Sequence, residues 1–369
     1  GPQPWDPRQP RDSLDLLPEA GVAVPTIETR SGGDTEDLFH LYEEVFGQAL
    51  TESSRRRWAW QYTENPAAAG EPAIWVARDG GQVLGQYASM PVRLHWGGRE
   101  VRSSWGMDVF LKEAARGRGI GAQLFDTWRH SVDVALGLGL TPSSYGLFKK
   151  MRYTDVGPVP FFVKVMDARA VARRRFGTPG AMASPLLALG WRLRHPERPQ
   201  RDASLAVAAA PSFGPEYDAL WERAGGAWTM CVRRDRAYLD WKYGRCPTRV
   251  YSVDEVLRDG ALAGFVVTRH EDYRGLRLGW VVDCFAARDD DAARDALLLA
   301  ALGRFRANGV ARAQAFAMSA PLGRSLRRLG FRGAPSPMQF CVSARVPSDG
   351  VFADPGGWHV VFGDSDMDR

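Results

Sequence analysis

The spacing of hydrophobic residues changes along the first half of the chain, and each change marks a different element. Apolar residues recur at helical spacing over residues 34–46 and again over residues 51–65, where Asp34 and Thr51 are suited to begin the two helices. The other predicted elements, in chain order, are a strand at 25–29, strands at 73–77, 83–94 and 108–111, a helix from 120, a short strand or turn at 141–145, a helix at 147–153 and a strand at 159–165. The predicted order is therefore β-α-α-β-β-β-α-β-α-β.

The second half of the chain repeats short motifs of the first half. The motif WxYxxxP at residues 60–66 returns at residues 241–247, and the motif RDG at residues 78–80 returns at residues 258–260. The offsets, 181 and 180 residues, nearly agree. Agreement between separate motifs predicts an internal duplication of one structural unit.

Composition narrows the class of protein only broadly. A chain of 369 residues is long enough for two domains, and its hydrophobic and charged fractions of 45% and 25% are those of globular proteins. A net charge of +5 suits an anionic ligand but does not by itself indicate nucleic-acid binding. The four cysteines form no CxxC pair, so we expect reduced thiols in a cytoplasmic protein, with no metal site and no disulfide. We also find no apolar run long enough to span a membrane.

The strongest candidate for chemistry is the glycine-rich stretch at residues 116–121. An apolar strand at 109–111 precedes it, and a helix with an apolar face follows it. Glycines let the backbone approach a ligand closely, and the first N–H groups of a helix point outward without partners. This arrangement forms a cradle for a phosphate. A P-loop is excluded because Gly121 is followed by Ala122 and not by Lys, and the glycine spacing does not fit a dinucleotide-binding fingerprint.

The stretch closely resembles the acyl-CoA pyrophosphate loop of the GCN5-related N-acetyltransferase (GNAT) family. The family pattern Arg/Gln-x-x-Gly-x-Gly/Ala is met by Arg116, Gly119 and Gly121. The resemblance implies an α/β fold of two tandem GNAT-like domains, each a mixed, mostly antiparallel sheet flanked by helices, with the loop kept only in the first. It also implies acetyl-CoA or another acyl-CoA as co-substrate, bound by Phe110, Leu111, Arg116, Gly117, Arg118, Gly119, Ile120, Gly121 and Ala122.

Domain limits follow from the repeat and from changes in composition. The predicted segments are a mobile tail at 1–22, a GNAT-like acyl-CoA-binding domain at 23–166, a basic linker at 167–202, a degenerate GNAT-like domain at 203–346 and a C-terminal segment at 347–369.

The resemblance implies that an amine attacks the thioester directly, which requires a base, an oxyanion donor and, in many members, an acid. Asp108 is the candidate base, although its recurrence as Asp283 also fits a shared structural role. The oxyanion donor is expected to be a backbone N–H near Phe110 or Leu111. The customary tyrosine acid is replaced by Phe148, so Tyr145 is the candidate acid.

The second copy differs where this chemistry would lie. Residues 286–294 contain no glycine and have three adjacent aspartates at 289–291, whose charge would repel a pyrophosphate. Near the end of the chain, Asp364, Asp366 and Asp368 could suggest a cation site, but we expect an exposed acidic end.

The predicted function is transfer of an acyl group, with acetyl as the expected one, from CoA to the amine of a small molecule. One alternative is a Fem-like transferase that uses aminoacyl-tRNA, because such enzymes also pair two GNAT-like folds and the linker is basic. The other is a non-catalytic acyl-CoA-binding module, suggested by the missing tyrosine. Nucleic-acid binding is otherwise not expected, and the sequence identifies neither the acceptor, the acyl chain nor the oligomeric state.

Overall fold

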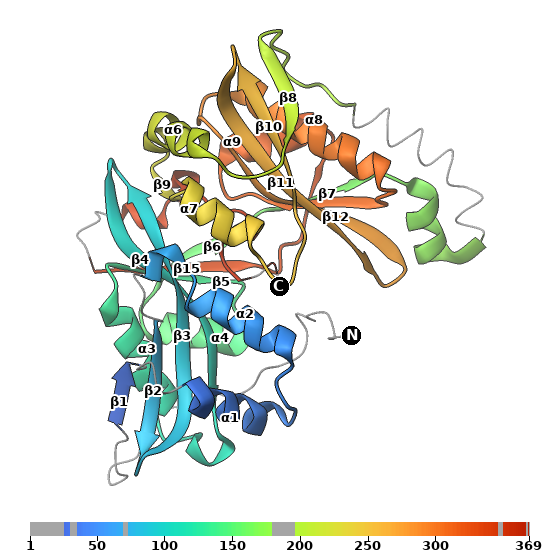
Figure 1. The fold of residues 1–369 in the computed structure, drawn as a ribbon. Coiled ribbons are helices and arrows are strands. Elements are labelled where there is room, and N and C mark those ends of the chain that lie inside the picture. Colours follow the sequence, from blue (N-terminus) through green and yellow to red (C-terminus); the bar gives the residue numbers. More distant parts are fainter. Residues whose placement is uncertain are drawn as a thin grey trace.

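The computed structural model describes residues 26–29, 35–68, 73–178, 196–345, 350–366 and 368. The tail predicted at residues 1–22 and the middle of the basic linker lie outside the described residues. Within them the chain forms two antiparallel-rich sheets with helices on both faces, one from each half of the chain (Figure 1). The mixed α/β fold of two sheets is the predicted one.

The first sheet is built mainly from the first half of the chain and has the order β1-β2-β3-β4-β5-β15-β6, with β9 and β16 attached beside β3. Only β4–β5 and β9–β16 pair in parallel. Its strands are β1 (Thr26–Thr29), β2 (Ile74–Asp79), β3 (Gln82–Trp96), β4 (Arg99–Leu111), β5 (Val134–Leu138), β6 (Thr154–Pro158), β9 (Met230–Val232), β15 (Gln339–Ala344) and β16 (Trp358–His359).

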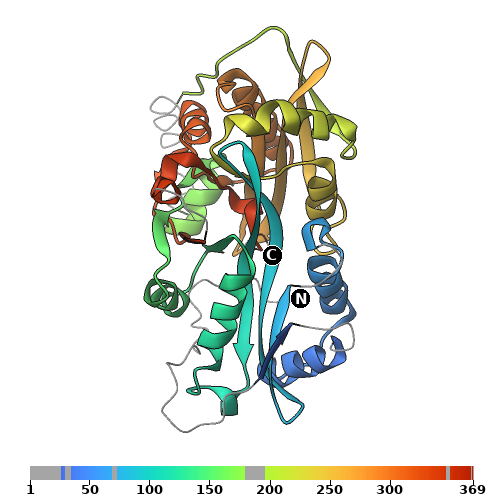
Figure 2. The same cartoon turned by 90° about the vertical axis from the view of Figure 1, so that its left-hand side faces the viewer.

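Helices cover the two faces of this sheet (Figure 2). Along β2, Ile74 and Val76 pack with α1 (Thr35–Phe46) and α2 (Glu52–Tyr62), whereas Trp75 and Ala77 pack with α3 (Ile120–Ser131) and α4 (Pro142–Lys150). This alternation follows from the two-residue period of a strand. The sheet therefore has an α1/α2 face and an α3/α4 face.

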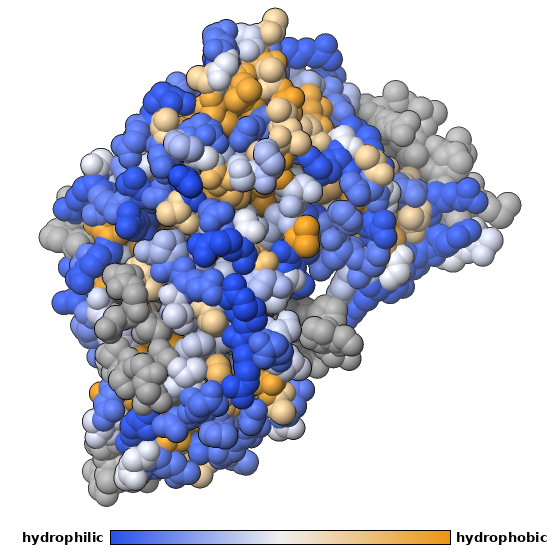
Figure 3. Space-filling view, in the orientation of Figure 1, coloured by the Kyte–Doolittle hydropathy of each residue, from blue (hydrophilic) through white to orange (hydrophobic). Residues whose placement is uncertain are grey.

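The second half repeats the same elements in the same order. Its sheet has the order β14-β7-β13-β12-β11-β10-β8. The elements are β8 (Leu205–Ala210), α6 (Pro215–Ala224), α7 (Arg236–Leu239) continued by a π-helical turn (Asp240–Gly244), β10 (Ser252–Arg258), β11 (Ala261–Tyr273), β12 (Leu276–Ala286), α8 (Asp291–Ala307), β13 (Arg312–Phe316), α9 (Ala320–Arg328) and β14 (Arg332–Ala334). Apolar residues gather on the surface at the top of the molecule, where β8 forms the edge of the sheet (Figure 3).

The two sheets exchange one strand. Strand β7 (Phe161–Val165), from the first half, lies between β13 and β14 of the second sheet. In return β15, from the second half, lies between β5 and β6 of the first sheet. Each sheet is thus completed by the other half of the chain, which the sequence analysis did not anticipate.

The repeated tryptophans join the two halves through a nearly symmetric contact. Trp60 on α2 stacks on Trp241, with ring centroids 5.1 Å apart. The indole Nε1 of each donates a 2.8 Å hydrogen bond to the backbone oxygen of the other. Both rings are buried, so the repeated tryptophans pack in the core between the two halves.

Between residues 134 and 165 the observed elements differ from the prediction. Residues 141–145 are not a strand or turn, because α4 begins at Pro142, where the Thr141 side chain caps it by accepting from the Ser144 N–H. The strand is β5, over the small-residue run at 134–138. The strand predicted at 159–165 is β7, which begins at Phe161, and the preceding strand β6 was not predicted.

Candidate active site

The candidate site begins where β4 and β5 separate. Their parallel pairing covers only Ser103–Val134 to Trp105–Leu136, yet β4 continues to Leu111. Pairing of β4 with β3 shifts register at this point, where Asp108 has a φ of +41°. Such a bulge bends the strand and increases its twist. The two strands consequently diverge and leave an opening in the sheet.

A cavity of about 550 Å³ occupies this opening. Its lining includes Phe39 and Trp58 from the α1/α2 face and Tyr87, Phe125 and Phe148 from the α3/α4 face. The cavity therefore passes through the sheet and has one end on each face. Two molecules that enter from opposite faces can meet at its centre, beside the bulge.

The end on the α3/α4 face is suited to an anion. Arg116 lines the cavity, and its Nε is buried without a hydrogen-bond partner among the described residues. Gly117 and Gly119 have φ values of +74° and +72°, a left-handed conformation that favours glycine. Gly119 is the N-cap of α3, and no side chain caps this helix end. Arg116 thus places a guanidinium at this end of the site, and the first N–H groups of α3 follow it closely in the chain.

The predicted CoA-binding residues have different positions. Phe110 and Arg116 line the cavity, whereas Leu111 and Ile120 are buried in the core beneath it. Arg118 forms an ion pair with Asp79, at 3.3 Å between Nη2 and Oδ2. Gly117, Gly119, Gly121 and Ala122 form the loop and the first turn of α3.

Asp108 lies at the centre of the cavity wall and is half-buried. Its carboxylate accepts hydrogen bonds from the Tyr62 hydroxyl and from Gln61 Nε2, the latter at 3.3 Å. The repeat preserves the tyrosine contact, because Tyr243 donates to Asp283 at 3.1 Å. Asp283, however, is fully buried and also paired with a guanidinium, whereas Asp108 borders the cavity. The shared contact positions the carboxylate in both halves, and only the first half presents it to a ligand.

Tyr145 has its hydroxyl directed to the Asp155 carboxylate, and Lys149 Nζ lies 4.4 Å from its ring centroid. It does not border the cavity, but Thr141 and Ser144 do. The sequence analysis missed these two hydroxyl groups; the Thr-Pro-x-Ser pattern of a helix start could have located them. Phe148, at the customary tyrosine position, is buried in the cavity wall.

The C-terminal segment fills the corresponding opening in the second sheet. The pairing of β12 with β13 ends at Val281–Ala315, and the segment enters there. Met318 N–H donates to Val360 O at 2.9 Å, Ala317 bridges to Val361, and Phe362 stacks on Trp280 at 4.4 Å. The segment is buried over residues 358–365. In the second half, the C-terminal segment therefore occupies the position that corresponds to the cavity of the first half.

A buried ion triad holds this segment in place. Arg234 pairs with Asp283 at 3.0 Å and with Asp364 at 2.8 Å, and all three side chains are almost fully buried. Burial raises the pKa of Asp364 to about 6, against the opposing effect of Arg234. Burial alone would lower the pKa of Arg234, but the two carboxylates outweigh it and raise that pKa.

The predicted exposed acidic end is wrong. Asp364 belongs to the buried triad, and the Asp368 carboxylate, 3% exposed, pairs with Arg269. Asp366, which the sequence analysis also assigned to the exposed acidic end, lines the cavity of the first half. Among the described residues, no group of three or more His, Cys, Asp or Glu side chains is placed to hold a metal.

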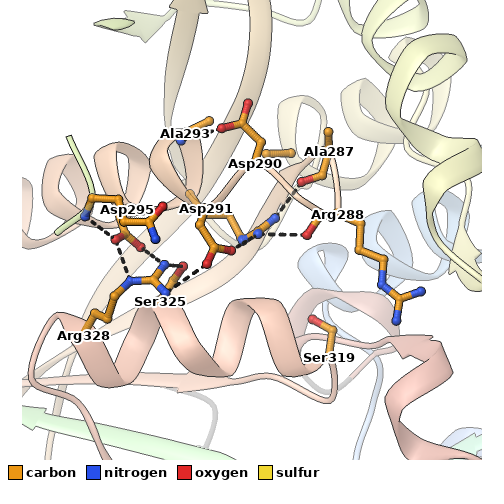
Figure 4. A network of polar contacts seen from close by, with 12 residues as sticks. Ala287, Arg288, Asp290, Asp291, Ala293, Asp295, Ser319, Ser325 and Arg328 are labelled. Carbon is orange, nitrogen blue, oxygen red and sulfur yellow. Dashed lines mark hydrogen bonds and ion pairs between the residues drawn. The ribbon is translucent and has the colours of Figure 1, made fainter. Parts of the chain in front are cut away.

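In the second half, the loop before α8 does not form an anion cradle, and charge repulsion is not the only reason. Side chains occupy the loop and the start of the helix (Figure 4). Asp290 caps α8 by accepting from the Ala293 N–H at 3.0 Å. Arg294 donates to the carbonyl oxygens of Ala287 and Arg288, at 2.7 and 3.0 Å. Arg328 donates to Asp291 at 3.0 Å. Asp290 pairs with Arg258, and Asp291 pairs with both Arg294 and Arg328. The Asp290 side chain also occupies the helix end.

Comparisons with known proteins agree with this geometry. Residues 26–154 match the model of the acetyltransferase (GNAT) domain. A search of curated proteins found no match. No helix within the described part of the chain is long and apolar enough to cross a membrane.

Several solved structures share the fold at low sequence identity. A GCN5-related N-acetyltransferase from Anabaena variabilis is 14% identical, with a TM-score of 0.59 over 86% of this chain and 72% of its own. A probable N-acyltransferase from Enterococcus faecalis is 13% identical, with a TM-score of 0.57 over 85% and 71%. Saccharomyces cerevisiae N-myristoyltransferase with bound myristoyl-CoA is 14% identical, with a TM-score of 0.51 over 92% and 86%.

The matched segment contains α1 to α4 and the glycine loop, and the solved acyltransferases share the fold over 85–92% of this chain. Residues 26–154 are therefore similar to the acetyltransferase domain of the GNAT family.

Proposed function

We propose that this protein is an N-acyltransferase that uses acyl-CoA, with acetyl-CoA as the expected donor, and a small-molecule amine as the acceptor. The observation that carries the proposal is the cavity through the first sheet, which is lined by Asp108 and by Arg116, whose buried Nε has no hydrogen-bond partner among the described residues. The uncapped start of α3 follows Arg116 closely in the chain. When bound, the donor supplies the activated acyl group as a thioester.

The residues of the α3/α4 face would hold the donor. Arg116 and the first N–H groups of α3 bind its pyrophosphate, because both offer positive charge to an anion. Gly117 and Gly119 allow the loop to approach without a Cβ in the way. A backbone N–H at Phe110 or Leu111, just beyond the bulge, is the proposed oxyanion donor.

Asp108 is the proposed base. An ammonium group has no lone pair, so the acceptor must lose a proton before its nitrogen can form a bond to the acyl carbon. Asp108 takes that proton directly or through water, and Tyr62 and Gln61 fix its orientation. The carbon–sulfur bond then breaks and the thiolate leaves. Tyr145 remains the proposed acid, and its hydroxyl would have to turn from Asp155 to serve the leaving group.

Four free cysteines suit a reducing compartment, so the proposal places the enzyme in the cytoplasm. This location rests on cysteine chemistry alone.

Calorimetry with CoA tests the donor site. Arg116→Glu is expected to weaken CoA binding at least tenfold, because it replaces a favourable charge with a repulsive one. Arg173→Glu, on the exposed face of the helical segment 168–178, is the matched control and should bind CoA like the parent protein.

Asp108→Asn should lower kcat by roughly 10²–10⁴-fold while leaving the CoA Kd unchanged. The proposal fails if the parent protein has no affinity for CoA.

A further inference from the structure

The end of the cavity on the α1/α2 face has a wall of aromatic rings. Phe39 packs edge-on against Trp58 with centroids 5.3 Å apart. Phe46 stacks with Tyr42 at 5.9 Å and meets Phe110 edge-on at 5.5 Å. Phe46 is nevertheless 48% exposed, at the mouth of the cavity. A partly exposed phenylalanine within an aromatic cluster offers an apolar surface to a ligand.

The polar groups at this end come from other elements. Helix α1 contributes aromatic and aliphatic side chains to the cavity, including Val45. The one hydroxyl among its cavity-lining side chains, on Tyr42, already accepts from Gln86 Nε2 at 3.3 Å. The charged side chains, Asp108, Arg57 and Asp366, belong to the bulge, α2 and the C-terminal segment. The acceptor end therefore has one apolar wall and one ionic wall.

We propose that the acceptor is a primary amine carried on an apolar aromatic body, an arylalkylamine in chemical class. This inference rests on the proposed function of the same cavity. The ring of the acceptor packs against Phe46, Tyr42 and Phe39, and its amine faces Asp108. A polyhydroxylated amine such as an amino sugar would place hydroxyl groups against the α1 wall, where burial without hydrogen bonds is costly.

Steady-state kinetics with acetyl-CoA and two amines tests the class. The probes are tryptamine, which has an aromatic body, and glucosamine, which has a polyhydroxylated one. The expected kcat/KM for tryptamine is at least tenfold higher, in keeping with the value of an apolar pocket for an apolar substrate. An equal or higher kcat/KM for glucosamine would overturn the inference.

The variant Phe46→Ala tests the wall itself. Because Phe46 is half-exposed, the variant should keep its thermal midpoint, which is checked first. It should raise the KM for tryptamine about tenfold and leave the KM values for glucosamine and acetyl-CoA within twofold. Phe176→Ala is the matched control, since Phe176 is 61% exposed and does not line the cavity; it should change none of these values.

Octanoyl-CoA separates the acceptor from the acyl chain. If Phe46→Ala raises the KM for octanoyl-CoA and spares tryptamine, the aromatic wall holds the acyl chain and the inference is wrong. Calorimetry of tryptamine binding to the CoA-loaded protein gives the same comparison where turnover is too slow to measure. Loss of CoA binding in the parent protein would contradict the proposed function, whereas intact CoA binding with the wrong amine preference contradicts only this inference.

Discussion

Lys242 is a buried cation that connects the C-terminal segment to the core. It is the counterpart of Gln61 in the repeat, and its Nζ donates to Ser365 O at 2.7 Å. Burial lowers its pKa to about 8, against the raising effects of Cys246, Asp368 and Asp364. Lys242 is therefore charged near pH 7, and keeping this buried charge lowers the stability of the folded state.

The contribution of Lys242 to the stability of the folded protein should increase as the pH rises from about 8 to 10.5. In this range the unfolded chain keeps the Lys242 proton and the folded chain has lost it, so the Lys242 contribution to the free energy of unfolding increases with pH. The increase is on the order of 3 kcal/mol if the whole shift is expressed. Urea unfolding of the parent protein and of Lys242→Met, at pH 7.5 and 10.5, measures it as a difference between the two proteins. A difference that does not change with pH would show that Lys242 is not titrating as a buried group.

Charged residues near the end of the chain show why sequence could not predict this part of the site. The sequence analysis assigned Asp364 and Asp368 to an exposed acidic end, because their partners lie about 100 residues or more away in the chain. These partners are Arg234 and Arg269. An ion pair of that kind exists only after the fold brings the two side chains together. The position of Arg116 just before α3 was predictable, because it depends on neighbours within a few residues.

At the scale of elements, the start of α3 depends on Gly119. Its φ of +72° is unfavourable for any residue with a Cβ. Gly119→Ala should therefore cost about 1–2 kcal/mol of unfolding free energy and weaken CoA binding, because the loop must shift.

Gly146 provides the matched control for Gly119. It lies inside α4, its φ is not positive, and a Cβ there would meet no atom within 4 Å. Gly146→Ala should stabilise the protein by about 0.5–1 kcal/mol and leave CoA binding unchanged. Denaturant unfolding and calorimetry measure both variants. Equal stability changes at the two sites would contradict the requirement for a left-handed residue at 119.

The elements themselves were largely predictable, and their errors have local causes. The repeat and the hydrophobic periodicity located α1, α2, α3, β2 and β3, but only residues 108–111 of β4, which begins at Arg99. The run at 134–138 was missed because small residues such as Ala135 and Gly137 give a weak strand signal. Gly137 is nevertheless required, since a Cβ there would lie 2.1 Å from the ring of Phe148.

At the scale of the whole molecule, the exchanged strands make the halves interdependent. A fragment of residues 23–166 lacks β15, which supplies hydrogen bonds to both β5 and β6. It also carries β7 with no partner among its own strands. Such a fragment should lack a cooperative unfolding transition and fail to bind CoA, because unpaired edges and exposed apolar faces are unstable.

Circular dichroism during thermal unfolding tests the fragment, and co-expression with residues 167–369 is the control that should restore CoA binding. A fragment that unfolds cooperatively on its own would show that the first half does not need β15. The exchange could not be read from the sequence, because β7 and β15 are both short strands with buried residues and either could fit either sheet.

The strand exchange also determines when the first sheet can be completed during synthesis on the ribosome. The first sheet cannot be closed when its own half emerges, because β15 is translated roughly 180 residues after the end of β7. At about 5–20 residues per second, the nascent chain waits roughly 10–35 seconds with the β5–β6 gap open. Throughout that interval an apolar seam is accessible to chaperones. A ribosome that stalls before residue 344 consequently releases a product whose first sheet is incomplete and which quality control can recognise.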